Sequence, residues 1–216
     1  MSKMIKHQNI IWDWNGTLFN DAELCMDIMN VLLRAYGRTE ISFERYRSIF
    51  TFPLIHYYKA AGHDISNGNF EKVGAEFIDH YEKRKYEAEL HHGVKEILEL
   101  FQSKGKKQYM LSAYTHEHLE KLLEHYGIAD YFENIQGNDN IYADGKMNLA
   151  KQMIEKIGDR NSIIMIGDTL HDYEIAEEFG VRCCISTSGH QSEERFVNTS
   201  AELVPSISSL IAEEDN

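Results

Sequence analysis

Two short stretches of this sequence place carboxylates directly after apolar segments. In the first, Asp13 follows Asn9-Ile10-Ile11-Trp12 and precedes Asn15 and Gly16-Thr17. A carboxylate at the end of a buried strand can act as a nucleophile toward a small anionic group. Asn15 is unusual in this place, because an amide cannot exchange protons as a second carboxylate would. The stretch therefore predicts covalent catalysis by Asp13 and leaves the source of acid–base help open.

The second stretch, Gly167-Asp168-Thr169-Leu170-His171-Asp172, follows the continuous apolar run Ser162 to Ile166. Glycine allows the backbone to turn tightly, and the two aspartates, four residues apart, can face the same edge. Carboxylate oxygens are the ligands that Mg²⁺ prefers. An aspartate after a strand can instead cap the helix that follows. We expect Asp168 to bind metal and keep both interpretations open for Asp172.

The segments that must position these carboxylates alternate between short apolar runs and helical spacing. We predict strands over residues 10–13, 108–111, 162–166 and 181–185, and helices over residues 21–36, 94–103, 116–126, 147–157 and 170–179. This alternation is typical of an α/β fold, a doubly wound parallel sheet with a Rossmann-like core. Ligands of such sheets lie beyond the carboxyl ends of the strands, where Asp13, Ser112 and Asp168 are expected to meet.

The segment between residues 20 and 88 shows helical spacing and no convincing strand. Further helices are predicted over residues 43–50, 53–61 and 70–86. We therefore predict an inserted α-helical cap at residues 20–88. The α/β catalytic core would consist of residues 1–19 and 89–216.

In these features the sequence resembles the haloacid dehalogenase-like hydrolase superfamily, in the branch that has a helical cap and includes phosphoglycolate phosphatase. Each motif alone is weak, but four of them occur in the order and spacing of the family. They are Asp13-Trp14-Asn15-Gly16-Thr17-Leu18, Ser112 after Tyr109-Met110-Leu111, Lys146 within Asp144-Gly145-Lys146-Met147-Asn148-Leu149, and Ile166-Gly167-Asp168 through Asp172.

The resemblance implies a Mg²⁺-dependent phosphatase that acts on a small phosphorylated metabolite. Asp13 would attack phosphorus and form an aspartyl-phosphate, which water then hydrolyses. The ion would be held by Asp13, the backbone carbonyl of Asn15 and Asp168, with Asp172 in support.

The same resemblance assigns phosphate binding to Ser112, to the backbone N–H of Ala113 and to Lys146. A lysine on a surface is ordinarily only solvated, so the role of Lys146 depends on its place in the motif. Lys151 is the alternative cation.

The cap would select the substrate and close over it. By family analogy its hinges lie near residues 18–20 and 89–93, and closure would exclude water. The residues nearest to the substrate would be Thr51, His56, Tyr57 and the loop of residues 18–21.

Asn15 leaves several alternatives open, because phosphatases of this family usually have an aspartate there. The leaving group could need no proton, as in an acyl phosphate or phosphoanhydride, or a histidine (His56, His116 or His171) could replace the missing acid. The protein could also be slow or could only bind phosphorylated metabolites. A phosphonoacetaldehyde hydrolase-like C–P hydrolase is a further alternative, and a phosphoryl-transferring mutase is weaker because mutases need the acid.

The composition restricts the partners and the compartment. Lys and Arg number 22 against 35 Asp and Glu, and the net charge of -13 disfavours nucleic acid as a partner. No segment resembles a signal peptide or a membrane span, which predicts a cytoplasmic protein, either a monomer or a homodimer. The cysteines, Cys25, Cys183 and Cys184, lack metal-ligand spacing and are expected to be reduced thiols.

Overall fold

A six-stranded parallel sheet carries the predicted motifs. The computed structural model describes residues 6–138 and 145–214. Every neighbouring pair of strands in the large sheet is parallel. The order across the sheet is β5 (Asn134–Asn138), β4 (Lys107–Thr115), β1 (Asn9–Trp12), β6 (Ile163–Gly167), β7 (Arg182–Ser186) and β8 (Glu202–Val204).

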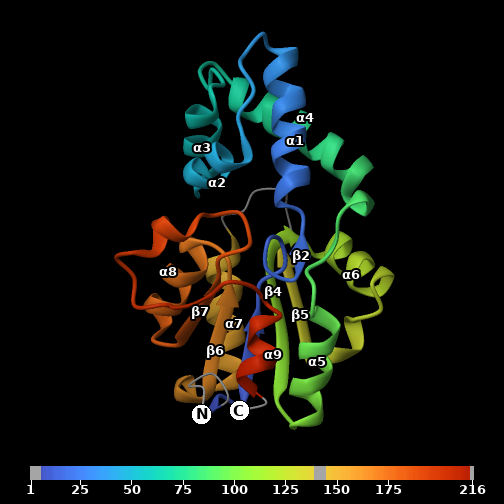
Figure 1. Cartoon of the computed structure of the whole chain (residues 1–216), viewed down its shortest axis with the longest axis vertical. Coiled ribbons are helices and arrows are strands. Elements are labelled where there is room, and N and C mark those ends of the chain that lie inside the picture. The colour runs from blue at the N-terminus through green and yellow to red at the C-terminus, as the bar shows by residue number, and fades with distance from the viewer. Residues whose placement is uncertain (1–5, 139–144, 215–216) are drawn as a thin grey trace.

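Helices cover both faces of this sheet (Figure 1). On β1, Ile10 and Trp12 pack into the hydrophobic cluster that includes one set of helices, whereas Ile11 packs into the cluster on the opposite face. The alternation follows from the two-residue period of a strand. The first set comprises α5 (Val94–Ser103), α6 (His116–His125) and α9 (Ser209–Glu214), and the second comprises α7 (Lys146–Ile157) and α8 (Leu170–Phe179).

Four helices lie together beyond one end of the sheet, at the top of Figure 1. Two very short antiparallel strands connect them to the core, β2 (Phe19–Asn20) and β3 (Glu89–Leu90). These strands coincide with the two predicted hinges. The four helices are α1 (Ala22–Ala35), α2 (Phe43–Ile49), α3 (Leu54–Ala61) and α4 (Asn69–Arg84).

The predicted fold class, a doubly wound parallel sheet with an inserted helical cap, is confirmed. Several details of the prediction are wrong. Asn20 belongs to a strand, and β4 continues past Ser112 to Thr115 with an irregular register between Leu111 and Thr115. The strands β5 and β8 were not predicted, because β5 contains few apolar residues and β8 is only three residues long. The division into core and cap at residues 19/20 and 88/89 stays a prediction.

The helices of the described residues do not include one that is long and apolar enough to cross a membrane.

Candidate active site

Asp13 lies at the carboxyl end of β1, buried in the middle of the sheet. Its backbone N–H donates to the carbonyl of Ile166 on the neighbouring strand β6, at 2.9 Å. The ammonium of Lys146, the first residue of α7, lies 2.5 Å from Asp13 Oδ1 and 2.6 Å from Asp172 Oδ1. The fold therefore brings a cation to the predicted nucleophile from 133 residues away in the sequence. Lys151, the alternative cation, is exposed.

The two carboxylates that contact this ammonium belong to a group of three. Asp13, Asp168 and Asp172 are all buried, and each offers an oxygen within 4.8 Å of the others. We call these three residues and Lys146 the carboxylate cluster. The Thr17 hydroxyl donates to Asp168 Oδ1 at 3.0 Å. This hydrogen bond connects the motif that contains Asp13 to the motif that contains Asp168.

The charges of the carboxylate cluster do not balance. Burial raises the pKa of Asp13 to about 6, although the charge of Lys146 opposes this shift. Burial also raises the pKa of Asp168 to about 8, although the charge of His190 opposes it. Burial would also raise the pKa of Asp172, but its contact with Lys146 outweighs burial and lowers that pKa. Two of the three buried acids thus share one lysine, and the third is opposed by His190, which already pairs with Asp21. The carboxylates therefore outnumber the cations around them, which favours binding of an additional cation.

Two glycines let the backbone approach Asp168 closely. A Cβ atom on Gly16 would lie 2.2 Å from Asp168 Oδ2, and a Cβ on Gly189 would lie equally close to the same oxygen. Gly16 also has a φ of +74°, a conformation that favours glycine. The backbone N–H of His190 donates to that oxygen at 2.6 Å. The aspartate is therefore enclosed by backbone, and its orientation is fixed.

Asp172 caps helix α8 and also contacts Lys146. Its Oδ2 accepts hydrogen bonds from the backbone of Asp168 and from the backbone and hydroxyl of Thr169, completing a capping box. Both oxygens of Asp172 thus have partners within the protein. The helix-cap interpretation describes the geometry, and its supporting role for a metal stays a prediction.

Ser112 and Ala113 lie at the irregular part of β4 and line the same cavity as Asp13 and Lys146. The Ser112 hydroxyl accepts a hydrogen bond from the backbone N–H of Tyr114 at 3.0 Å, so its own proton is free to point elsewhere. The structure thus brings both residues to the cavity that Asp13 lines, and their role in phosphate binding stays a prediction.

The side chain of Asn15 points toward the connection to the helical layer. Its Nδ2 donates to Asp21 Oδ2 at 2.7 Å and to the Tyr81 hydroxyl at 2.8 Å. The same Asp21 oxygen accepts from Tyr81, and the other accepts from the backbone N–H of Gly16 at 2.9 Å. Asn15 is therefore a donor to a buried carboxylate.

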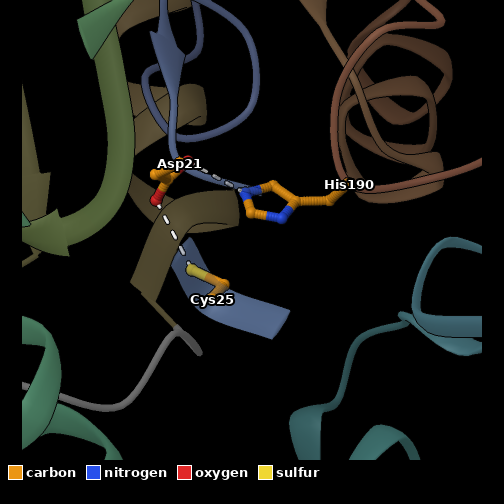
Figure 2. Close-up of side chains that lie close together, drawn as sticks. All are labelled: Asp21, Cys25 and His190. Atoms are coloured by element: carbon orange, nitrogen blue, oxygen red, sulfur yellow. Dashed lines mark hydrogen bonds and ion pairs between the residues drawn. The ribbon is translucent and has the colours of Figure 1, made fainter. Parts of the chain in front are cut away.

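A buried histidine completes this second group, as Figure 2 shows. His190 Nε2 lies 3.3 Å from Asp21 Oδ1, and its Nδ1 lies 2.6 Å from the Tyr46 hydroxyl of α2. Burial opposes protonation, yet the neighbouring Asp21 raises the pKa of His190 to about 9, so the pair is ionic. Cys25 also contacts Asp21, at 3.6 Å. We call Asn15, Asp21, Tyr46, Tyr81 and His190 the linker cluster.

The sequence did not predict the linker cluster. Asp21 has the appearance of a helix N-cap, and His190 is one of eleven histidines. The available signal was the position of His190 four residues after a strand, at the same edge of the sheet as Asp13. Of the histidines proposed to replace the missing acid, His171 lines the cavity, whereas His56 and His116 are not among its lining residues.

A cavity of about 780 Å³ lies between the carboxylate cluster and the cap helices. It reaches Asp13 and Lys146 at one end and helices α3 and α4 at the other. Of the residues expected to select the substrate, Tyr57 and Asp21 line it. Thr51, His56 and residues 18–20 are not among its described lining residues. A ligand in this cavity would touch both the nucleophile and the cap.

Comparison with known proteins agrees with this geometry. A family model described as haloacid dehalogenase-like hydrolase matches residues 10–186. The chain belongs to this family of enzymes, which confirms the resemblance found in the sequence.

Two curated proteins and many solved structures resemble the chain over nearly its whole length. A 5'-nucleotidase of Pseudomonas aeruginosa is 24% identical over 201 residues, 88% of this chain and 87% of the relative. A phosphoglycolate phosphatase of Rhodobacter capsulatus is 24% identical over 190 residues, 84% of this chain and 85% of the relative. A haloacid dehalogenase-like hydrolase from Streptococcus pneumoniae has a TM-score of 0.81 at 19% identity and covers 98% of this chain and 100% of its own.

Proposed function

We propose that this hydrolase is a Mg²⁺-dependent phosphatase that cleaves a small phosphomonoester through a covalent intermediate on Asp13. The observation that carries the proposal is the position of Asp13: it is buried, paired with Lys146, and opens on a cavity closed by the cap. The names of the two curated relatives support it, since a 5'-nucleotidase and a phosphoglycolate phosphatase both hydrolyse phosphomonoesters. The net charge of -13 favours a small phosphorylated metabolite over nucleic acid as substrate.

The covalent step uses an oxygen of Asp13. This oxygen forms a bond to phosphorus as the ester P–O bond breaks, and the leaving oxygen takes a proton from water. A second water molecule then attacks phosphorus, which releases inorganic phosphate and restores the Asp13 carboxylate. Lys146 holds the nucleophile in place and pairs with the phosphoryl group, and Ser112 and the N–H of Ala113 would donate to its oxygens.

The carboxylate cluster fits a divalent cation. Three buried carboxylates with oxygens within 4.8 Å, opposed by one ammonium, are the hard oxygen donors that Mg²⁺ prefers. Asp13, Asp168 and the backbone carbonyl of Asn15 would hold the ion. Asp172 would support them through its contacts with Lys146 and with the backbone of Asp168. When bound, the ion would offset the repulsion between an anionic nucleophile and an anionic substrate.

The first test is release of inorganic phosphate from p-nitrophenyl phosphate with Mg²⁺ and with a chelator. We expect phosphate release that requires the metal and that falls at least about 10⁴-fold in Asp13→Asn, because the nucleophile is lost. Asp130→Asn, an exposed aspartate of the core, is the matched control. The Mg²⁺-loaded protein should also form a beryllofluoride adduct on Asp13.

A protein that only binds phosphorylated metabolites is the second candidate, and Asn15 is the observation that favours it. The side chain of Asn15 carries no ionisable proton and donates to Asp21 and Tyr81. Saturable binding without phosphate release or adduct would establish this alternative. A C–P hydrolase that forms a Schiff base is less consistent, since Lys146 is the single lysine among the described lining residues and two carboxylates hold it.

A further inference from the structure

The cap side of the cavity is a wall of aromatic rings. Seven phenylalanines and tyrosines that are not part of the linker cluster contribute rings to the lining of the cavity. Tyr114 comes from β4, and the other six come from the cap: Phe50, Phe52, Tyr57, Tyr58, Phe70 and Phe77. Several meet edge to face, such as Tyr58 with Phe70 at 84° and 5.4 Å between ring centroids. Rings in this arrangement offer both faces and edges to an additional ring.

The cavity has no cation available for an anionic leaving group. Among the described lining residues Lys146 is the single lysine or arginine, and Asp13 and Asp172 already hold it. His190 pairs with Asp21, and His171 lies beside an acid of its own helix, with 3.7 Å between its Nδ1 and Glu174 Oε2. A carboxylate pushed against the aromatic wall would lose its water without gaining a partner.

The acidic lining residues outside the two clusters strengthen this conclusion. Glu71, Glu82 and Glu174 also border the cavity, and they would repel a second negative charge on the substrate. The one buried polar atom that the wall offers is the Tyr57 hydroxyl, which has no hydrogen-bond partner among the described residues. It can pair with a polar substituent of an uncharged ligand.

The volume of the cavity agrees with a leaving group larger than glycolate. At about 780 Å³ it lies in the range of pockets that enclose drug-sized ligands. The chemistry at Asn15 agrees as well, because a phenol has a pKa of about 10 and leaves as an anion more readily than an alkyl alcohol does. An ester of a phenol would therefore need the missing acid least.

We infer that the cavity takes a phosphate ester whose leaving group carries an uncharged aromatic ring system, and that it discriminates against small carboxylates such as glycolate. The inference rests on the proposed phosphatase function for turnover, but not for binding. Two classes of substrate fit this description: the phosphate esters of phenols and the nucleoside monophosphates.

The decisive experiment compares matched ligands on the Mg²⁺-loaded wild-type protein. Calorimetry measures the binding of phenylphosphonate and of phosphonoacetate, which share a non-ester phosphonate group and differ in the ring and the carboxylate. We expect phenylphosphonate to bind at least about 10-fold more tightly. Equal binding, or tighter binding of phosphonoacetate, would overturn the inference even if the protein proves to be an active phosphatase.

Kinetics then locate the effect in the aromatic wall. We expect kcat/KM for phenyl phosphate and for adenosine 5'-monophosphate to exceed that for phosphoglycolate. The ester with the higher kcat/KM indicates whether the natural substrate is an ester of a phenol or a nucleoside monophosphate. Phe77→Leu, which keeps the apolar volume but removes a ring, should raise KM for the aromatic esters by about 2- to 10-fold. It should change the phosphoglycolate value less than 2-fold. Loss of activity toward all substrates alike would contradict a role in recognising rings.

A matched control separates the ring effect from a loss of stability. Phe132 is a half-buried phenylalanine that packs in the core away from the cavity, and Phe132→Leu should leave the substrate preference unchanged. If no ester releases phosphate while phenylphosphonate still binds preferentially, the proposed activity fails and the inference stands.

Discussion

The carboxylate cluster and the linker cluster are both buried, but they differ in charge balance. They are neighbours, because Asp168 accepts from the backbone of His190 and Gly16 lies between Asp168 and Asp21. The carboxylate cluster opposes three acids with one lysine, and all its residues come from the predicted core. The linker cluster pairs Asp21 with His190. Asn15 and Tyr81 donate to Asp21, and the Tyr46 hydroxyl pairs with the other ring nitrogen of His190. An unbalanced cluster has capacity for a ligand, whereas a balanced one fixes geometry. We expect the first to carry the chemistry and the second to set the position of the cap.

Polar contacts between the cap and the core lie at the linker cluster and in the loop next to it. Tyr46 and Tyr81 reach the linker cluster from α2 and α4, and Gln191 donates to the Phe50 carbonyl at 2.8 Å. Arg47 of α2 donates to the carbonyls of Thr187 and Gln191 in the loop after β7. The carboxylate cluster makes none of these contacts in the described part of the chain. Opening the cap would therefore disturb the linker cluster and leave the contacts within the carboxylate cluster in place.

The largest effect on stability is expected from breaking the charge pairing of the carboxylate cluster. Lys146→Met leaves the buried carboxylates of Asp13 and Asp172 without a cation, and removing one partner of a buried ion pair typically costs about 3–5 kcal/mol. Urea unfolding in the absence of metal would measure the free energy of unfolding. Lys151→Met on the exposed face of the same helix should change it by less than about 0.5 kcal/mol. Equal values for the two variants would show that the cluster does not depend on this lysine.

Mg²⁺ should distinguish the two clusters through its effect on stability. A cation that binds the folded state alone raises the free energy of unfolding, by about 2.7 kcal/mol at a concentration 100 times its Kd. We expect the rise in Tm with Mg²⁺ to disappear in Asp168→Asn and to persist in Asp21→Asn. Calorimetric scans with and without the ion provide the measurement. Loss of the Mg²⁺ effect in the Asp21 variant alone would place the cation in the linker cluster instead.

An exchange of side chains between Asn15 and Asp21 tests whether the linker cluster accepts only one carboxylate. Asn15→Asp places a second carboxylate where the 2.7 Å hydrogen bond now lies, and we expect a loss of about 1–3 kcal/mol from repulsion and a lost donor. Adding Asp21→Asn should recover part of this loss, because an amide again faces a carboxylate. A double-mutant cycle from urea unfolding gives the coupling energy.

The same exchange has a kinetic consequence. Either variant with an acid at position 15 should hydrolyse esters of poor leaving groups at least as fast as the wild type, since an acid there can protonate the leaving oxygen. Slower hydrolysis by both variants would show that the amide of Asn15 has a positive role in turnover.

The parts of the site that were predictable from sequence lie next to strands. Asp13 and Asp168 directly follow apolar runs, and the parallel register of β1 and β6 makes them neighbours. Lys146 was predictable only by resemblance, because no spacing rule links it to a residue 133 positions away. The linker cluster was not predictable, because its tyrosines have the spacing of core aromatics and its contacts connect four separate elements. The strand β5 was not predicted because its own sequence, Asn134-Ile135-Gln136-Gly137-Asn138, has a single aliphatic side chain.

The smallest of these effects concerns a histidine of the cap that contrasts with His190. His63 lies against the rings of Tyr36 and Tyr58, and its Nε2 has no hydrogen-bond partner among the described residues. Burial, together with the charge of Arg38, lowers the pKa of His63, and the opposing charge of Glu76 does not compensate. The folded protein therefore binds this proton less readily than the unfolded chain does. The free energy of unfolding should decline as the pH falls below about 6.5, the ordinary pKa of histidine.

Urea unfolding between pH 7.5 and pH 5.5 would isolate this contribution. We expect His63→Gln to reduce the loss of stability at low pH, because glutamine does not take up a proton. His56, an exposed histidine of α3, supplies the matched control variant His56→Gln. His190 has the opposite sign: Asp21 raises its pKa, so its proton stabilises the folded state throughout this range. A profile unaffected by His63→Gln would mean that the cap already hydrates this imidazole, and that its wall is looser than the packing around Tyr58 indicates.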